Sequence, residues 1–314
     1  MDVQLLQWAG LLALAIVVLV KGADVLLRGA TEIGKSLGLS SFIIGVVIVG
    51  VGTSLPEVAS SLAAVLQEET TIVIANAVGS NITNILLVVG FVALLYGPIR
   101  VRKKLIQTEL PIFFIATTHF LASVYDGQVD RLEALLLVGT FSAYLWYLLS
   151  DPDSHEREGL FSRAKALKLS SVGFVVLGLA GLLVGAHYTI SMTINIATAL
   201  NVPIGLVSIL AIAIGTSLPE LFASLKAAQQ KKAELAIGGI FGSNAFNILL
   251  VVGLPGLLAP LKADAVVMEL GLIVLLAASA IFFVNGLARQ FMRWEGAMML
   301  LFFGFFLAKL YEFI

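Results

Sequence analysis

Two copies of one six-residue stretch carry the side chains best suited to chemistry in this sequence. The stretch G-T-S-L-P-E occurs at 52–57 and again at 215–220, and each copy combines a carboxylate with two hydroxyls. A second polar stretch follows each copy, G-S-N-I-T-N at 79–84 and G-S-N-A-F-N at 242–247. All four lie within apolar sequence, so their polar atoms need partners other than bulk water.

Oxygen is the donor atom that these side chains share. Ca²⁺ takes about six to eight oxygen ligands, and Na⁺ also prefers hard oxygens. Neither histidine nor cysteine joins the set, which disfavours zinc and copper. The candidate ligands are the side chains of Glu57, Glu220, Asn84, Asn247, Thr53, Thr216, Ser54, Ser217, Ser80 and Ser243, together with the backbone carbonyls of Gly50 and Ala213.

A proline in each copy predicts a break in the helix that contains it. Proline lacks an amide hydrogen and displaces the carbonyl four residues earlier. Pro56 would release the carbonyl of Gly52, and Pro219 that of Gly215. In lipid, a released carbonyl is costly unless it lines a cavity or meets a cation.

The charge of the candidate site constrains its partners. A charged residue at the centre of a membrane helix costs roughly 2.5–3.5 kcal/mol on insertion scales. The sequence places no lysine or arginine at the depth of Glu57 and Glu220, so their counter-charge must be mobile. One Ca²⁺ or two Na⁺ would neutralise both carboxylates. The alternative is a pair of protonated glutamates that hydrogen-bond within a helix bundle.

Composition places the chain in a membrane. Of its 314 residues, 59% are hydrophobic and 12% are charged, and the mean hydropathy is +1.03. A soluble domain carries roughly a quarter charged residues. The net charge of −1 gives no basis for binding nucleic acid. The first apolar stretch, Leu5 to Leu27, is too long for a signal-peptide core, and we interpret it as a retained membrane helix.

Apolar stretches long enough to span about 30 Å of hydrocarbon predict an all-α membrane protein with ten transmembrane helices. The longest polar connection, 151–168, is predicted to be a cytoplasmic linker between a five-helix repeat at 1–150 and a second at 169–314. The ten stretches are 4–27, 42–66, 72–96, 105–124, 132–150, 169–190, 203–228, 234–259, 264–285 and 292–312.

Lysine and arginine predict the orientation, because cytoplasmic loops carry an excess of both. With the N-terminus outside, the cytoplasmic loops hold fifteen of them and the outer loops only Arg131 and Lys262. We therefore expect both termini outside a cell membrane, the inner or plasma membrane.

An internal repeat links the two halves. Residues 52–90 align with 215–253 without a gap, at an offset of 163, and 21 of the 39 positions are identical. Since five helices per half is an odd number, the copies must cross the membrane with opposite polarity. Inverted-topology repeats are typical of secondary transporters, whose sites lie at the repeat interface. We expect broken helices 2, 3, 7 and 8 to form that core. A duplication kept for packing alone is the alternative.

The duplicated pairing of G-T-S-L-P-E with G-S-N-x-x-N closely resembles the α-repeats of the sodium/calcium exchanger family, within the calcium:cation antiporters. The resemblance spans essentially the whole chain and is to a compact prokaryotic member, since no large cytosolic loop is present. It implies exchange of about three Na⁺ for one Ca²⁺ by alternating access, with the first and sixth helices sliding across the other eight. We expect Ca²⁺, Na⁺ and the lipid bilayer as partners, no organic cofactor, and a functional monomer.

The same resemblance implies a role for each candidate ligand. Glu57 and Glu220 match acidic ligands shared by the Ca²⁺ site and the central Na⁺ site, and Asn84 and Asn247 match the central amide pair. The hydroxyl residues Thr53 and Thr216, and the serines Ser54, Ser80, Ser217 and Ser243, match ligands of these and the flanking Na⁺ sites. The residue that matches Asn247 is an aspartate in K⁺-dependent exchangers and in some prokaryotic members, so the amide found here disfavours a K⁺ requirement.

Other functions and residues leave alternatives open. H⁺ or K⁺ could replace or join Na⁺ as the coupling ion, and a passive channel is a second alternative within transport. An intramembrane hydrolase would need a base beside Ser54 or Ser217, and no histidine is near either in sequence. Asp24 has two possible roles, pairing with Lys21 or Arg28, or capping a gate. Its repeat mate His187 is either a gate residue or an ordinary helix residue.

Overall fold

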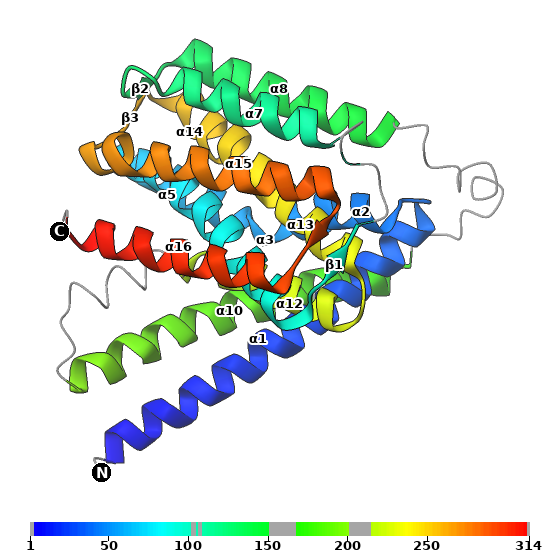
Figure 1. The fold of residues 1–314 in the computed structure, drawn as a ribbon. Helices are drawn as coiled ribbons and strands as arrows, with labels where there is room; N and C mark the ends of the chain where they lie inside the picture. Colours follow the sequence, from blue (N-terminus) through cyan, green and yellow to red (C-terminus); the bar gives the residue numbers. More distant parts are fainter. Residues whose placement is uncertain (1–2, 102–104, 106–108, 151–167, 201–214, 313–314) are drawn as a thin grey trace.

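The computed structural model describes residues 3–101, 105, 109–150, 168–200 and 215–312, and its long elements are helices (Figure 1). The helices and π-helical segments of the first half are α1 (Val3–Ser36), α2 (Ser41–Ile43), η1 (Ile44–Gly50), α3 (Val51–Thr53), α4 (Leu55–Leu66), α5 (Thr71–Ile82), η2 (Thr83–Val89), α6 (Gly90–Tyr96), α7 (Glu109–Ser123) and α8 (Arg131–Ser150). Those of the second half are α10 (Leu169–Ala199), α12 (Leu218–Gln229), α13 (Ala233–Phe246), η5 (Asn247–Val251), α14 (Val252–Leu258), η6 (Val267–Gly271), α15 (Leu272–Ala288) and α16 (Arg293–Glu312).

Seven helical stretches among the described residues are long and apolar enough to cross a membrane. They correspond to predicted helices 1, 2, 3, 6, 8, 9 and 10, while the fourth and fifth predictions are α7 and α8. Of the seventh prediction, 203–228, only the part from 215 is described. The chain is therefore an all-helical, multi-pass membrane protein. The linker 151–168 lies, except for its last residue, outside the described residues.

Two helices are longer than predicted. We placed their ends at 27 and 190, where apolar sequence gives way to polar residues, but α1 continues to Ser36 and α10 to Ala199. In α1 the extra turns carry an Arg28–Glu32 ion pair one helical turn apart, at 3.1 Å, which supports helix outside an apolar environment. Gly38, with φ of +71°, then ends the helix in a left-handed conformation that glycine adopts at no steric cost.

The helices α1 and α10 pack along each other over much of their length and form a pair beside the rest of the bundle (Figure 1). Glycines make this approach possible. A Cβ atom added at Gly22 would lie 2.8 Å from the backbone nitrogen of Leu182, and one at Gly185 would lie 2.9 Å from that of Leu19. Small residues allow such contact between membrane helices, where no hydrophobic effect drives helices together.

Two short antiparallel ribbons connect loops at opposite ends of the bundle. Strand β1 (Ile99–Arg100) pairs with β4 (Gln290–Phe291), and β2 (Gln128–Val129) pairs with β3 (Leu261–Lys262). Among the described residues, α7 lies between β1 and β2, and η6 with α15 lies between β3 and β4. The two ribbons lie at opposite ends of the bundle (Figure 1). Adding 163 to the residue numbers of β1 and β2 gives approximately those of β3 and β4, so each ribbon is the repeat copy of the other. Two copies of one ribbon at opposite ends of the bundle are expected of inverted repeats.

The largest hydrophobic core lies in the helices outside the α1–α10 pair. At its centre the rings of Phe113, Phe241 and Phe282 contact one another, with centroids 4.4–5.5 Å apart. A separate buried cluster joins α1 and α10 to α12 and η1. The α1–α10 pair is thus attached to the bundle through an apolar surface of its own.

Candidate cation-binding site

Each glutamate lies in the first turn of a helix that begins after a break. The first break is at Ser54, whose φ and ψ are −91° and 4°, and Pro56 and Glu57 follow in the first turn of α4. In the second half Ser217, at −88° and 4°, precedes α12 with Glu220 in its first turn. The first predicted break is therefore present, and Ser217 has the same backbone conformation at the start of α12, while 201–214 lie outside the described residues. Proline begins a helix here rather than interrupting its interior, because a first-turn residue needs no amide hydrogen.

The third and eighth predicted helices are not broken, and this part of the prediction was wrong. Instead, each widens from an α-helix to a π-helix where its second asparagine lies. The change follows Ile82 in the first half, where Asn84 is the second residue of η2, and follows Phe246 in the second, where Asn247 begins η5. Neither stretch contains a proline at this point, so the backbone changes its hydrogen-bond spacing without losing helicity. Such π segments are frequent at functional sites.

Three contacts bring the two repeats together around these residues. Ser54 donates to Oε1 of Glu220 at 3.1 Å. The hydroxyls of Thr53 and Ser243 are 3.5 Å apart, and those of their repeat mates, Thr216 and Ser80, are 3.2 Å apart. Residues far apart in sequence thus form one buried group. Two of its contacts, Thr53 with Ser243 and Thr216 with Ser80, are copies of each other in the two repeats.

The backbone carbonyl of Gly50 belongs to the same group. It accepts hydrogen bonds from Ser243 at 3.1 Å and from Thr53 at 3.3 Å. A Cβ atom at position 50 would lie 2.6 Å from the carbonyl oxygen of Gly239, so only glycine fits this helix crossing. The second predicted carbonyl, that of Ala213, lies outside the described residues.

Many polar atoms of this group are buried without a hydrogen-bond partner. Glu57, Asn84 and Asn247 are 0% exposed and Glu220 is 3% exposed. Among the candidate ligands that the structure describes, the atoms without a partner are both carboxylate oxygens of Glu57, Oε2 of Glu220, both amide atoms of Asn84 and Asn247, and the hydroxyl of Ser217. Leaving one such atom unpaired costs about 1–3 kcal/mol, and more for a charged group.

When both are ionised, the two buried carboxylates bring two negative charges to this group. The ion pairs found among the described residues do not include either of them. The unpaired atoms are mainly oxygens that could bind a metal ion, and they include two negative charges. Such a set suits a hard cation and does not suit an apolar ligand. The residues present therefore suit Ca²⁺ or Na⁺ as the bound species.

Three further asparagines lie beside this group, and the sequence-based list omitted them. Asn76 donates to Ser60 and Ser61 at 3.2 Å and to the carbonyl of Glu57 at 3.4 Å, which ties α5 to α4. Asn81 and Asn244 are buried next to the serines. The signal for this pair was available, because an asparagine stands at the same place in both copies of G-S-N-x-x-N.

Asp24 pairs with neither of the residues expected. Its carboxylate is 3.1 Å from the amine of Lys226 and accepts from the side chain of Gln230 at 3.0 Å, so it links α1 to the end of α12. Burial lowers the pKa of the nearby Lys232 amine; Lys35 adds to that shift and Asp24 opposes it.

The histidine at the matching position shows no polar contact of this kind in the described structure. His187 is exposed on α10, and its ring packs edge-on against Tyr188 at 5.4 Å. This contact does not distinguish between the two readings, an ordinary helix residue or a gate residue. Its proposed role in a gate stays a prediction.

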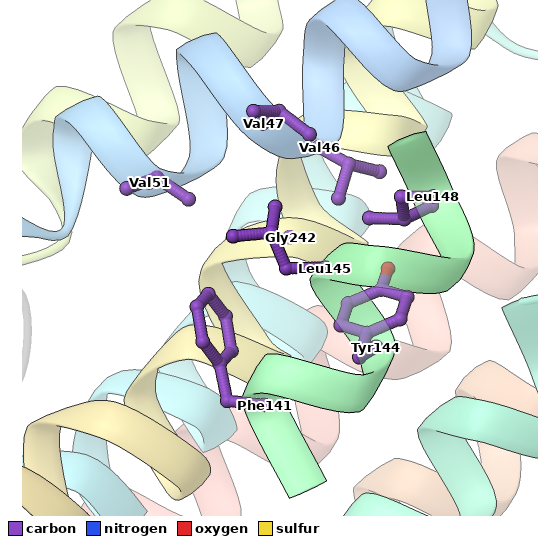
Figure 2. Close-up of a pocket in the computed structure, with 8 residues that line it drawn as sticks. All are labelled: Val46, Val47, Val51, Phe141, Tyr144, Leu145, Leu148 and Gly242. Atoms are coloured by element: carbon purple, nitrogen blue, oxygen red, sulfur yellow. The ribbon is translucent and has the colours of Figure 1, made fainter. Parts of the chain in front are cut away.

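An apolar pocket lies beside the site but is not part of it. Figure 2 shows its lining residues, which come from η1 and α3, from α8, and from Gly242 of α13. Tyr144 carries the one hydroxyl among the eight lining side chains, and none of the eight is a candidate ligand. The pocket therefore does not suit a cation.

Helices that begin at breaks inside a membrane bundle, and that place unpaired carboxylates at a repeat interface, define a cation transport protein. The family described as sodium/calcium exchanger protein matches residues 7–150 and 170–311. The sodium/calcium exchanger MaX1 of Methanosarcina acetivorans is 32% identical over 96% of this chain and 97% of its own. The inner membrane protein YrbG of Escherichia coli is 35% identical over 87% of this chain and 86% of its own.

Solved structures agree with the sequence relatives. The sodium-calcium exchanger NCX_Mj, soaked with zero Na⁺ and Ca²⁺, superimposes with a TM-score of 0.81 at 27% identity and covers 98% of this chain and 99% of its own. Soaked with Na⁺ and Sr²⁺, it gives a TM-score of 0.80. The chain belongs to the sodium/calcium exchanger family, as a prokaryotic NCX_Mj-like member. It is a cation antiporter of that type and not an enzyme.

Proposed function

We propose that this protein exchanges Na⁺ for Ca²⁺ across a cell membrane, about three Na⁺ for one Ca²⁺, by alternating access. The observation that supports this most directly is the pair of buried carboxylates whose counter-charge the described protein does not supply. A mobile cation must then accompany every conformation in which both are ionised. If Ca²⁺ and Na⁺ occupy overlapping sites, their movements are coupled without further machinery.

The proposed ligands follow from the geometry and the family. Glu57 and Glu220 bind Ca²⁺ or a central Na⁺, with Thr53, Thr216, Asn84 and Asn247 around them. The serines Ser54, Ser80, Ser217 and Ser243 bind flanking Na⁺ ions. The carbonyls of Gly50 and Ala213 would complete the two sides. At Gly50 a bound cation would replace hydrogen bonds that the carbonyl accepts from the hydroxyls of Thr53 and Ser243 in this structure.

Alternating access is proposed to occur between the α1–α10 pair and the remaining helices. The close backbone contact between α1 and α10 supports their movement as one body. The separate apolar cluster that joins them to α12 supports sliding, since apolar contacts are not directional. Sliding would have to break the ion pair of Asp24 with Lys226 and its hydrogen bond from Gln230. The protein is further proposed to act as a monomer with both termini outside.

Uptake of ⁴⁵Ca²⁺ into Na⁺-loaded proteoliposomes tests the proposal. We expect accumulation that depends on internal Na⁺ and is lost when K⁺ replaces Na⁺. Because the proposed exchange moves a net charge, an inside-negative potential should slow Ca²⁺ uptake that is driven by internal Na⁺.

The same vesicles test the alternatives. Uptake that ignores internal Na⁺ and follows an imposed proton gradient would show H⁺ coupling and overturn the assignment. Uptake that requires K⁺ together with Na⁺ would contradict the inference from Asn247. Ca²⁺ that equilibrates without any counter-ion would show a channel.

A further inference from the structure

Asn81 and Asn244 are repeat mates that touch each other at the centre of the molecule. They are 163 residues apart, and each follows a serine of the site, Ser80 or Ser243. Their exposed fractions are 1% and 0%. The side-chain nitrogen of Asn81 donates to the carbonyl oxygen of Asn244 at 3.0 Å. A contact between two mates lies on the pseudo-two-fold axis, because only there does a residue meet its own copy.

The contact lies where a helix changes its hydrogen-bond spacing. Asn244 is in the last turn of α13, and η5 begins three residues later at Asn247, whose amide hydrogen also reaches the Asn244 carbonyl. The amide of Asn81 is thus a second donor to a carbonyl at the α-to-π junction. That junction sets the direction in which Asn247 leaves the helix, and Asn247 is a candidate ligand.

The contact is made in one direction only. Within the described residues, both amide atoms of Asn244 have no hydrogen-bond partner, and neither does the side-chain oxygen of Asn81. The site is asymmetric in the same way. Ser54 donates to Glu220, whereas its mate Ser217 has no partner. Asn81 and Ser54 of the first repeat therefore donate hydrogen bonds to the second repeat. Their mates Asn244 and Ser217 have the same donor groups but make no such bonds to the residues that the structure describes.

In a protein made of inverted copies, one access state becomes the opposite one if each copy adopts the conformation of the other. The site then opens to the other side of the membrane. A bond that one copy makes in one access state should then be made by the other copy in the opposite state. Leaving a buried amide without a hydrogen bond is costly, so each state is stabilised when one of the two amides is paired.

We propose that Asn81 and Asn244 are positioning residues that exchange one hydrogen bond between the two access states. In this structure Asn81 donates to the carbonyl of Asn244; in the opposite state Asn244 donates to the carbonyl of Asn81. The bond from Asn81 fixes the junction before η5 and so orients Asn247 in this state. The bond from Asn244 fixes the junction before η2 and so orients Asn84 in the opposite state. This inference rests on the proposed exchange by inverted repeats.

Leucine at either position tests the switch, since it keeps the side-chain shape and removes the donor. Right-side-out and inverted membrane vesicles expose opposite faces of the protein, and ⁴⁵Ca²⁺ uptake gives the half-saturating Ca²⁺ concentration on each face. Weakening one access state lowers the apparent affinity on its own face and raises it on the other. We expect Asn81→Leu to shift the two faces in opposite directions, by about three- to tenfold, and Asn244→Leu to reverse both shifts.

The matched control is Asn285→Leu, the same change at a residue that is 6% exposed in α15, whose side-chain nitrogen also has no partner in the described structure. It should move both faces equally or not at all. Asn81→Gln, which keeps a donor, should restore part of the wild-type ratio between the faces. Shifts of the same sign on both faces, or shifts no larger than those of the control, would overturn the proposal.

Backbone hydrogen exchange in detergent gives a readout that needs no transport. Asn81→Leu should speed exchange in 247–251, and Asn244→Leu should speed it in 83–89, because each loosens the opposite repeat's π segment. Variants that loosen their own segment, or both segments equally, would contradict the switch. This measurement decides the proposal even if wild-type vesicles accumulate no Ca²⁺, a result that would refute only the proposed exchange.

Discussion

At the scale of single residues, the proposed cation selectivity rests on two glutamates and two asparagines. The carboxylates contribute two negative charges, and the amides contribute oxygens without charge. A Ca²⁺ ion neutralises the pair, whereas a third Na⁺ leaves an excess positive charge that the membrane potential acts on. We therefore expect the amide at position 247 to affect both the ion selectivity and the electrogenicity of the proposed exchange.

Replacing either glutamate by glutamine should abolish Ca²⁺ exchange without preventing folding. We expect the uptake rate to fall by about 10- to 100-fold or more for Glu57→Gln and for Glu220→Gln, because a charge-assisted ligand is lost from a buried site. In cation-free detergent the same variants should unfold at a higher temperature, since burying a charge is costly. Retained Ca²⁺ uptake in both variants would show that the carboxylates are structural.

Adding a carboxylate should have the opposite effect on affinity. A third negative charge within a few ångströms of a divalent ion strengthens binding, and we expect Asn247→Asp to lower the half-saturating Ca²⁺ concentration by about tenfold or more. Slower Ca²⁺ release should also reduce the maximal rate. Asn84→Asp, at the matching position, serves as the comparison. An unchanged Ca²⁺ dependence in both variants would place these amides away from the ion.

At the scale of elements, glycines decide how closely α1 and α10 approach. Gly178 faces the backbone of α1, and an added Cβ atom would lie 2.5 Å from the Cα atom of Leu26. Gly173, in the same helix, has no atom within 4 Å of that position. The two glycines therefore separate the effect of helix propensity from that of packing.

Gly178→Ala should destabilise the protein by about 1–3 kcal/mol, because the new methyl group forces the helices apart. Gly173→Ala should be neutral or stabilise by up to about 1 kcal/mol, because alanine favours a helix over glycine. Thermal unfolding in detergent measures both, and ⁴⁵Ca²⁺ uptake shows whether the pair still moves. Equal effects of the two substitutions would argue against tight packing at Gly178.

At the scale of the whole molecule, the two ribbons indicate how the halves are arranged. Each ribbon joins one loop from either half, and α7 and α15 carry the chain from one ribbon to the other. Arg100 and Arg289 are exposed at the ribbon that includes β1 and β4, and Arg131 and Lys262 are exposed at the other ribbon, so the ribbons alone do not distinguish the two faces. The proposed orientation puts the β1–β4 ribbon on the cytoplasmic face.

Because the chain contains no cysteine, single introduced thiols can test this orientation against no background. Tyr125, 84% exposed before β2, is predicted to lie outside, and Arg289 inside. A membrane-impermeant thiol reagent should label Tyr125→Cys in intact cells and Arg289→Cys only after permeabilisation. The reverse pattern would invert the proposed topology while leaving the fold unchanged.

Much of the site was predictable because it depends on local composition and on a repeat. The duplicated stretches identified Glu57, Glu220 and the hydroxyl and amide residues near them, and Pro56 and Pro219 identified the breaks. The ends of α1 and α10 were not predictable from hydropathy, since both helices continue past the apolar stretch. The π segments were also missed, because an α-helix and a π-helix share nearly the same residue preferences.

The amino-acid sequence by itself determined the membrane class, the two copies, the donor atoms and the charge of the site, since these depend on residue types and spacing. Tertiary structure alone decided which donors are already paired. It joined Ser54 to Glu220, directed Asp24 to Lys226 rather than to its neighbours in α1, and set the donor direction between Asn81 and Asn244. Contacts between repeats depend on where two backbones cross, and a residue pattern within one helix does not contain that information.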